Sequence, residues 1–326
     1  MKLLVTGGAG LIGSHVVDAY VEAGHDVVVV DDLSTGRRAN LNPAAKFFEM
    51  SILDDDLAKV FDTERPDLVS HQAARASVQE SLRDPVGYAR TNVIGSLNVL
   101  ESCRRSDVRK VIYASTGGAG YGEPQWLPVT EDHPMNPLDP YGASKHHVEH
   151  YLSAYRRNFG IDFTILRYPN VFGPRQDPDG EAGVVAIFIR QMLEGVQPVI
   201  TGDGEQTRDF VYASDVAAAN VLCVRAPEGR TYNLGTGSGT TVNEVFQSIR
   251  SVLGVEPPEV HGPAKSGEVR HIALDASLIE RERDWRPAVT LAEGLRATVD
   301  FFRDSKRGQP SPDASKGGER QRQPTA

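Results

Sequence analysis

The chain has 326 residues, 40% hydrophobic and 24% charged, so it can bury a full core, and disorder as its main state is excluded. Its formal charge of −9 has the wrong sign for a nucleic-acid-binding surface, and we expect no nucleic-acid partner. Only two cysteines occur, and no apolar run approaches the roughly 20 residues of a membrane span. These features predict a cytoplasmic protein with no disulfide framework and no membrane contact.

From the N-terminus, short apolar runs alternate with amphipathic stretches, a pattern typical of parallel strands covered by helices. Strands are predicted over residues 3–6, 27–30, 68–70, 111–114 and 163–166, and helices over 12–23, 86–105 and 141–159. Gly24 follows the first predicted helix, where a residue without a Cβ suits a left-handed cap. The prediction is an α/β fold with a Rossmann-type doubly wound parallel sheet over residues 1–167.

The second part of the chain is richer in Pro and Gly and has shorter predicted helices, over residues 184–193, 213–225 and 242–253. We assign residues 168–304 to a smaller C-terminal α/β lobe that binds the substrate, with some of its segments returning to the first domain. Residues 305–326 have almost no apolar side chains, which predicts a disordered tail.

A glycine-rich segment lies between the first predicted strand and the first predicted helix. Gly7, Gly10 and Gly13 match the spacing GxxGxxG, and Gly8 in place of Gly7 gives GxGxxG. Such glycines allow a tight turn and a close approach of the backbone to a pyrophosphate at the helix N-terminus. Asp31, at the end of the second predicted strand, can accept hydrogen bonds from the adenosine ribose and repel a 2′-phosphate. The pattern predicts a dinucleotide site that prefers NAD to NADP.

Two arginines weaken the preference for NAD. Arg37 and Arg38 follow Asp31 closely, and an arginine near the ribose can accommodate a 2′-phosphate. The alternative is that both are solvated loop charges.

The segment Tyr141-Gly-Ala-Ser-Lys145 is a YxxxK element at a predicted helix start, with Asp139 placed to cap the helix and Pro140 in its first turn. Tyr141 and Lys145 are four residues apart and share a helix face. The lysine ammonium can therefore lower the pKa of the phenol and allow it to act as a base.

The strand predicted before this helix ends in hydroxyl side chains. Ser115 and Thr116 complete it, and Gly117 and Gly118 follow. Ligands of open parallel sheets bind at the carboxyl ends of the strands, which places these hydroxyls near the dinucleotide.

Together these motifs resemble the extended short-chain dehydrogenase/reductase family, specifically its nucleotide-sugar epimerases and most closely those that act on UDP-glucose. The likeness covers residues 1 to about 302. It is based on residues 5–15, 31–36, 91–95, 114–119, 121–122, 141–145, 167–175 and 202–209.

The resemblance implies an isomerase that interconverts UDP-galactose and UDP-glucose at carbon-4 through a transient 4-keto sugar. Tyr141 would take the proton of the 4-hydroxyl while the hydride of carbon-4 passes to tightly held NAD and later returns to the other face. Lys145 would hold the nicotinamide ribose and tune the tyrosine. Thr116 would bridge Tyr141 and the substrate. Because the family position falls on Gly117, this assignment assumes a one-residue insertion, and Ser115 is the alternative.

The resemblance also implies which residues contact NAD. They are Gly7, Gly10, Leu11, Ile12, Gly13, Asp31, Asp32, Ser51, Ile52, Ala73, Asn92, Ser115, Tyr141 and Lys145. Ser51 departs from the family pattern, which usually has an Asp near the adenine, so the contacts around Ser51 and Ile52 are the least supported.

The implied UDP-sugar site includes Thr116 and Tyr141 and extends into the C-terminal lobe. Asn170 matches the family asparagine that holds the diphosphate, and Arg208 matches an arginine that precedes an Asp-Phe pair. Lys265 takes the place of a second family arginine, and Arg270 is expected to share its task because an ammonium lacks the two-pronged contact of a guanidinium.

Substrate choice stays open. Ala273 aligns with a position that carries a large aromatic in some family members, so N-acetylated sugars such as UDP-N-acetylglucosamine also fit the pattern. An epimerase for UDP-glucuronate, or a dehydratase or reductase of the same fold, is the alternative function. A 4,6-dehydratase needs an acidic pair beside the strand-end Thr, where this chain has Gly117 and Gly118. A catalytically silent NAD-binding protein is the third possibility.

Two further features concern metals and assembly. His146, Glu149 and His150 spell HxxEH, but the motif overlaps the catalytic helix and lacks a third-ligand context, so we expect no metal site. The family dimerises through two helices per subunit, which implies a homodimer built from residues 86–105 and 141–159.

Overall fold

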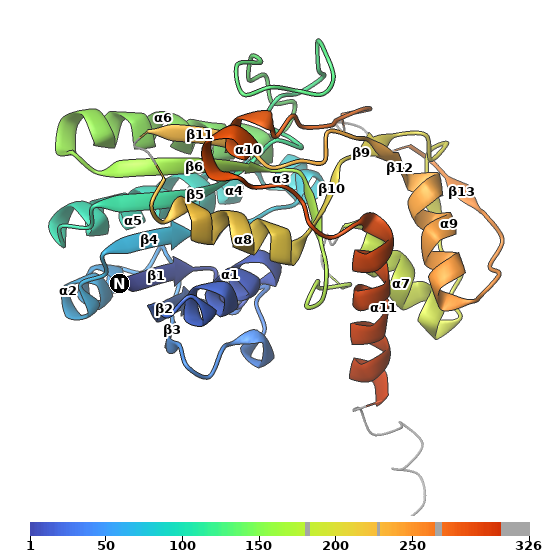
Figure 1. Cartoon of the computed structure of the whole chain (residues 1–326), viewed down its shortest axis with the longest axis horizontal. Helices are drawn as coiled ribbons and strands as arrows, with labels where there is room; N and C mark the ends of the chain where they lie inside the picture. Colours follow the sequence, from blue (N-terminus) through green and yellow to red (C-terminus); the bar gives the residue numbers. More distant parts are fainter. Residues whose placement is uncertain (180–182, 227–228, 265–268, 308–326) are drawn as a thin grey trace, which may run out of the picture.

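The structure is a computed structural model that describes residues 1–179, 183–226, 229–264 and 269–307. At its centre is a parallel sheet with the strand order β11-β6-β5-β4-β1-β2-β3 (Figure 1). The strands are β1 (Lys2–Thr6), β2 (Asp26–Asp31), β3 (Lys46–Glu49), β4 (Leu68–His71), β5 (Lys110–Thr116), β6 (Asp162–Tyr168) and β11 (Arg230–Asn233). The predicted Rossmann-type sheet is confirmed, and the sequence prediction missed its two edge strands, β3 and β11.

The helices cover both faces of the sheet. On one face, α1 (Leu11–Glu22) packs against α8 (Ala213–Cys223) over a buried apolar cluster. On the other face lie α2 (Leu57–Glu64), α5 (Gly95–Arg105) and α6 (Pro140–Phe159) over a second cluster. Gly24 has φ +79° just beyond α1, which confirms the left-handed cap. Because both faces are covered, the central strands are apolar almost without interruption.

The helix predicted over 86–105 is segmented. It begins with α4 (Pro85–Ala89), continues as a π-helical turn over Arg90–Ile94 and ends as α5. A short helix, α3 (Val78–Arg83), precedes it. Single π-helical turns are frequent at functional sites, and this one contains Asn92.

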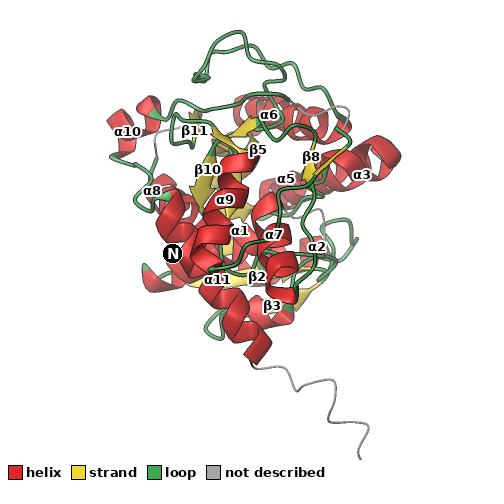
Figure 2. Ribbon diagram, turned by 90° about the vertical axis from the view of Figure 1, so that its right-hand side faces the viewer, coloured by secondary structure: helices red, strands yellow, loops and turns green. Residues whose placement is uncertain are grey.

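The C-terminal lobe has its own apolar core. Its helices α7 (Val184–Glu194), α9 (Val242–Leu253) and α11 (Leu291–Arg307) pack together on the side viewed in Figure 2. Short strand pairs join its loops: β7 (Asn170–Phe172) with β10 (Phe210–Tyr212), β9 (Thr207–Arg208) with β12 (Thr240–Thr241), and β8 (Ile200–Thr201) with β13 (His261–Gly262).

Three C-terminal elements belong to the first domain or lie near it: α8 packs on α1, β11 extends the sheet next to β6, and α10 (Ser277–Arg283) lies against β11. Helix α11 continues to Arg307, three residues into the predicted tail, and residues 308–326 lie outside the described residues. Among the described helices, none has the length and apolar character needed to cross a membrane.

Candidate active site

The candidate site lies where the strand order reverses. The chain moves outward from β1 through β2 to β3 and then returns to the other side of β1 with β4. In open α/β sheets, ligands bind at this reversal, beyond the carboxyl ends of the strands. The ends of β1, β4 and β5 bring Gly7, Ala73 and Thr116 to this edge, and the Ala73 N–H donates to Thr6 Oγ1 at 3.2 Å.

The glycine loop leaves no room for side chains. Gly7 has φ +71°, and a Cβ on it would lie 2.6 Å from the Ala73 nitrogen. A Cβ on Gly13 would lie 2.0 Å from the Gly7 carbonyl oxygen. Gly10 begins α1 without a side-chain cap, so a phosphate group can reach the first amides of the helix, those of Leu11 and Ile12. The loop therefore fits a dinucleotide pyrophosphate.

Asp31 connects the end of β2 to this loop. Its carboxylate is 8% exposed and accepts hydrogen bonds from the N–H groups of Ala9 at 2.9 Å and Leu33 at 2.8 Å. Burial raises the pKa of Asp31, and the two backbone hydrogen bonds act in the opposite direction. Asp32 turns away and accepts from the Ser34 N–H at 3.0 Å.

The two nearby arginines are paired with carboxylates. Arg37 donates to Asp177 at 2.7 Å, and Arg38 contacts Glu49. Both guanidiniums therefore already have anionic partners, which favours the prediction of NAD over NADP.

The predicted adenine contacts lie along the next loop. The Ser51 N–H donates to the Asp54 carboxylate at 2.9 Å. Ile52 is buried and packs against Gly95, where a Cβ would come within 2.6 Å of the Ile52 side chain. The structure thus places Ile52 in the core below the π-helical turn.

Asn92 braces the catalytic helix. Its Oδ1 accepts from the Arg75 N–H at 2.8 Å, and its Nδ2 donates to the Arg75 carbonyl at 3.0 Å and to Ser144 Oγ at 2.9 Å. The Asn92 amide is therefore engaged by the loop after β4 and by α6. This connects the dinucleotide side of the edge to the YxxxK element.

Helix α6 begins as predicted: Asp139 Oδ1 accepts from the Gly142 N–H at 2.8 Å, and Pro140 occupies the first turn. The helix places Tyr141 near the end of β5, close enough for Thr116 to affect the pKa of its hydroxyl. Burial raises the pKa of Tyr141 to about 12, and the hydrogen bond with Thr116 lowers it.

The choice between the two strand-end hydroxyls follows from their partners. Ser115 Oγ donates to Glu149 Oε1 at 2.6 Å. Glu149 lies on α6, one turn beyond Lys145. Thr116 Oγ1 accepts from the Ala119 N–H at 3.2 Å, and Thr116 is the strand-end hydroxyl that lowers the pKa of Tyr141. The geometry therefore favours Thr116 as the bridging group.

Lys145 is buried below Tyr141. It is 3% exposed, and its Nζ lies 4.5 Å from the centre of the Tyr113 ring. Burial lowers the pKa of Lys145 to about 7, and the charge of Glu149 raises it. Lys145 follows Tyr141 by one turn of α6, and a positive charge near a phenol favours the phenolate, the form that acts as a base.

The C-terminal lobe places Asn170 opposite the strand-end glycines. A Cβ on Gly118 would lie 3.6 Å from Asn170 Oδ1. Within the described part of the chain, the Asn170 amide makes no side-chain hydrogen bond, which leaves it available to a ligand.

Two basic residues lie nearby. Arg208 donates to the carbonyl of Thr207 at 2.9 Å, and Arg270 makes a two-pronged pair with Asp203 at 3.0 and 2.7 Å. Arg270 would have to leave Asp203 to bind a diphosphate. Lys265 lies outside the described residues.

Ala273 lies inside the lobe rather than on its surface. It is 5% exposed, and its carbonyl accepts from the Val129 N–H at 2.7 Å. The next residue, Leu274, covers Gly117, where a Cβ would come within 2.4 Å of Leu274 Cδ1.

The HxxEH segment and the cysteines do not form a second site. Glu149 is turned inward to Arg167, and His146 contacts His150 with 3.2 Å between their Nε2 atoms. No group of three or more potential metal ligands occurs among the described residues. Cys103 and Cys223 are buried free thiols.

The C-terminal lobe is organised by Asp209, a residue that the sequence motifs did not single out. Asp209 is fully buried, and its carboxylate accepts from the N–H and Oγ1 of Thr236 and from the Leu274 N–H at 2.7 to 3.0 Å. The ion pair between Glu149 and Arg167 was not predicted from the sequence either. The signal available for Glu149 was its i+4 spacing from Lys145 on the predicted helix.

The fold and the site together define a Rossmann-type protein with a glycine loop that fits a dinucleotide and with Thr116, Tyr141 and Lys145 at the same edge of the sheet. Residues 3–235 match the NAD dependent epimerase/dehydratase family, and the chain belongs to this family. The UDP-glucose 4-epimerase of Mycolicibacterium smegmatis is 42% identical over 93% of this chain and 99% of that protein.

Solved structures agree with this assignment. A crystal structure of the UDP-glucose 4-epimerase of Thermotoga maritima with UDP-glucose has a TM-score of 0.92 and 47% identity, over 94% of this chain and 100% of that one. A UDP-glucose 4-epimerase of Thermus thermophilus in complex with NAD has a TM-score of 0.89 and 44% identity, over 93% of this chain and 99% of that one.

Proposed function

We propose that the protein is an isomerase that interconverts UDP-galactose and UDP-glucose at carbon-4 through a transient 4-keto sugar, with NAD as its cofactor. The observation that carries the proposal is the position of Tyr141 and the buried Lys145 one turn apart on α6, with Tyr141 close enough to Thr116 at the end of β5 for Thr116 to lower its pKa. These groups lie at the same sheet edge as the glycine loop. Relatives that are 42 to 47% identical are UDP-glucose 4-epimerases, which supports the reaction.

In this proposal, bound NAD supplies the chemistry of accepting a hydride and returning it. Tyr141 removes the proton of the sugar's 4-hydroxyl and returns it in the second half of the reaction. Lys145 favours the phenolate through its positive charge, and Thr116 orients the hydroxyl that loses the proton. The net redox change is zero, so the bound NAD has the same oxidation state before and after each turnover.

The residues that hold the cofactor follow from the same geometry. The glycine loop, with Leu11 and Ile12 at the start of α1, would receive the pyrophosphate, and the Asp31 carboxylate would receive the adenosine ribose. Gly7 and Gly13 have no room for a Cβ beside Ala73 and the loop backbone, so the backbone itself forms the contact surface. Asp32 and Ser51 are expected to contribute less because their polar groups are held by local turns.

Substrate binding is assigned to Asn170 and Arg208, with a smaller part for Arg270 because Asp203 already holds its guanidinium. An anionic diphosphate can compete with a surface carboxylate for that guanidinium, since the pair is half-exposed and worth little. Lys265 completes the proposed set.

The experiment that tests the function adds UDP-galactose to purified protein without added NAD and follows the anomeric protons of the sugar by NMR. Appearance of UDP-glucose supports both the reaction and a retained cofactor. If UDP-galactose stays unchanged while NAD is bound, the activity on this sugar is rejected.

A second substrate is suggested by Ala273. In this proposal the small side chain of Ala273 leaves room for an N-acetyl group on carbon-2 of the sugar, so UDP-N-acetylglucosamine is also a substrate. Good turnover of UDP-galactose together with no turnover of UDP-N-acetylglucosamine would reject this broader specificity. A 4,6-dehydratase is disfavoured, because this chain has Gly117 and Gly118 after Thr116 in place of the acidic pair that such an enzyme needs.

The proposed assembly is a homodimer in the cytoplasm, with residues 1–167 as the NAD-binding domain, residues 168–304 as the substrate lobe and later segments returning to the sheet. The α4-to-α5 segment and α6 pack together and expose Val86, Ile94, Tyr151 and Phe159. Exposed apolar side chains on adjacent helices favour contact with a second copy. A monomeric mass by analytical ultracentrifugation would contradict the dimer.

A further inference from the structure

A buried ion pair lies directly behind the proposed catalytic groups. Tyr141, Lys145 and Glu149 are spaced by four residues on α6 and share one face of the helix. Arg167, near the end of β6, donates from Nε to Glu149 Oε1 at 3.1 Å and from Nη2 to Oε2 at 2.7 Å. Both side chains are less than 10% exposed. A two-pronged pair of this kind fixes the orientation of both groups.

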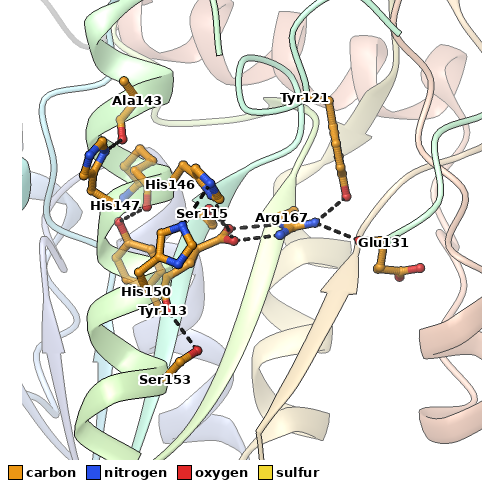
Figure 3. Close-up of polar contacts among 12 residues, drawn as sticks. Tyr113, Ser115, Tyr121, Glu131, Ala143, His146, His147, His150, Ser153 and Arg167 are labelled. Carbon is orange, nitrogen blue, oxygen red and sulfur yellow. Dashed lines mark hydrogen bonds and ion pairs between the residues drawn. The ribbon is translucent and has the colours of Figure 1, made fainter. Parts of the chain in front are cut away.

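The pair connects the elements that carry the active site. Ser115, the neighbour of Thr116 on β5, donates to Glu149. On the other side, Arg167 Nη1 donates to the Tyr121 hydroxyl at 2.8 Å, and that hydroxyl donates to Asn233 Oδ1 on β11 at 2.6 Å. Figure 3 shows Arg167 between the histidine-bearing helix α6 and Tyr121. Helix α6 is thereby tied to β5, β6 and β11.

The same pair supplies charge next to Lys145. Burial raises the pKa of Glu149, but the contacts with His146, Arg167 and Ser115 lower it to about 2, so Glu149 is a carboxylate at neutral pH. The charge of Glu149 raises the pKa of Lys145 against the effect of burial.

Among the residues that the structure describes, Glu149 is the one carboxylate whose charge acts on Lys145. The Tyr113 ring of β5 lies beside its ammonium, and Tyr141 lies on the preceding turn of α6. His71 of β4 is neutral, because burial and the nearby Lys145 charge lower its pKa to about 3.

Stability alone does not explain this arrangement. A buried ion pair costs desolvation, and replacing both partners by uncharged side chains of similar size is often neutral for folding. What such a replacement removes here is the fixed geometry between β5 and α6 and the negative charge behind Lys145.

We propose that Glu149 and Arg167 are a positioning pair of the active site, which fixes Thr116 relative to Lys145 and keeps a carboxylate charge beside the Lys145 ammonium. Neither residue touches the reacting atoms in this assignment; both act through Lys145 and the end of β5. The inference rests on the proposed function of Thr116, Tyr141 and Lys145.

The test uses the full-length protein and the variant Glu149→Gln, which keeps the size of the side chain and removes its charge. The pKa of Lys145 is measured by NMR titration of protein labelled with ¹⁵N-lysine, in which the variant Lys145→Met identifies the Lys145 signal. We expect this pKa to be about one unit lower in Glu149→Gln than in the wild type. We expect kcat with UDP-galactose to fall about 100-fold, because small misplacements of reacting groups have effects of this size. KM is expected to stay within about threefold.

The matched control is Asp162→Asn. Lys110 and Asp162 form an ion pair, 3.7 Å apart with 10% and 15% exposure, between the same two strands as Ser115 and Arg167 but at their opposite ends. This variant is expected to lose stability while the Lys145 titration and kcat keep their wild-type values.

The double variant Glu149→Gln with Arg167→Met separates positioning from folding. Removing both charges is expected to restore stability relative to Glu149→Gln alone, while kcat stays low and the Lys145 titration stays shifted. Wild-type kcat in the double variant, or an unshifted Lys145 in Glu149→Gln, would overturn the proposal. Absence of epimerisation by the wild-type protein would reject the proposed function instead, and the Lys145 titration would still test the charge effect.

Discussion

The two halves of the site are built in different ways. At the sheet edge, backbone geometry places the functional groups: Thr116 and Gly7 follow from the ends of β5 and β1, and Tyr141 follows from a helix start capped by Asp139. In the C-terminal lobe, one buried side chain, Asp209, joins its own segment to the loops of Thr236 and Leu274. The groups at the sheet edge can therefore be predicted from short sequence motifs. Those in the C-terminal lobe depend on contacts between residues distant in the chain.

The largest expected effect is at the sheet edge. Tyr141→Phe removes the proposed base and keeps the ring that packs against Tyr88. We expect kcat for UDP-galactose to fall by a factor of about 10² to 10⁴, with an unchanged melting temperature, as measured by NMR turnover and thermal unfolding.

The control for this change is Tyr155→Phe, at the other end of the same helix, where the hydroxyl donates to Glu101. It is expected to retain wild-type turnover. Full activity of Tyr141→Phe would show that the sheet edge does not hold the catalytic base.

The second largest expected effect is a loss of stability when the buried carboxylate of the C-terminal lobe is removed. Asp209→Ala leaves the N–H groups of Thr236 and Leu274 without their acceptor, and each unsatisfied buried donor costs about 1–3 kcal/mol. We expect the free energy of unfolding in urea to fall by about 3 kcal/mol or more.

Asp203→Ala, in the same segment, is the matched control because the Asp203 side chain is 55% exposed. Its effect on the free energy of unfolding is expected to stay within about 0.5 kcal/mol. If the two substitutions lower the free energy of unfolding equally, the Asp209 carboxylate does not organise the lobe.

This difference also explains what the sequence predicted. The parallel sheet, the glycine turn, the cap of α6 and the position of Tyr141 and Lys145 one turn apart on that helix depend on local spacing, and the structure has all of them. The edge strands β3 and β11 were missed because they are short and carry charged and polar residues. The π-helical turn around Asn92 was missed because its residues continue an ordinary helical pattern.

The site in the lobe was predictable only through family resemblance. Asp209 follows Arg208 in a motif that was recognised, yet nothing local shows that its carboxylate reaches Leu274, 65 residues further on. The pairing of Arg270 with Asp203 is hidden for the same reason. Contacts of this kind are specified by tertiary packing, which residue spacing does not encode.

A third prediction concerns the two neighbouring hydroxyls of β5. Thr116→Ala removes the partner of Tyr141 and is expected to lower kcat about tenfold, the equivalent of one hydrogen bond. Ser115→Ala removes a hydrogen bond to Glu149 and is expected to cost about 1 kcal/mol of stability with a smaller effect on kcat. The opposite order in turnover assays would make Ser115 the bridging hydroxyl.

The smallest expected effect concerns acid stability beneath the sheet edge. His71 is 1% exposed, its ring nitrogens lie 2.7 Å from Thr6 Oγ1 and 2.8 Å from Ser96 Oγ, and burial lowers its pKa from 6.5 to about 3. Between these pH values the unfolded chain binds a proton that the folded chain does not bind. The contribution of a neutral His71 to stability is therefore present above pH 6.5 and decreases as the pH falls toward 3.

Urea unfolding at several pH values checks this expectation. The free energy of unfolding of the wild type is expected to decrease more steeply than that of His71→Asn as the pH falls below 6.5. Hydrogen exchange in the same range is expected to rise first in β4, which ends at His71, and in its neighbour β1, and later in α7 and α9 of the lobe. Parallel curves for the two proteins, or earlier exchange in the lobe, would show that acid sensitivity does not originate at the sheet edge.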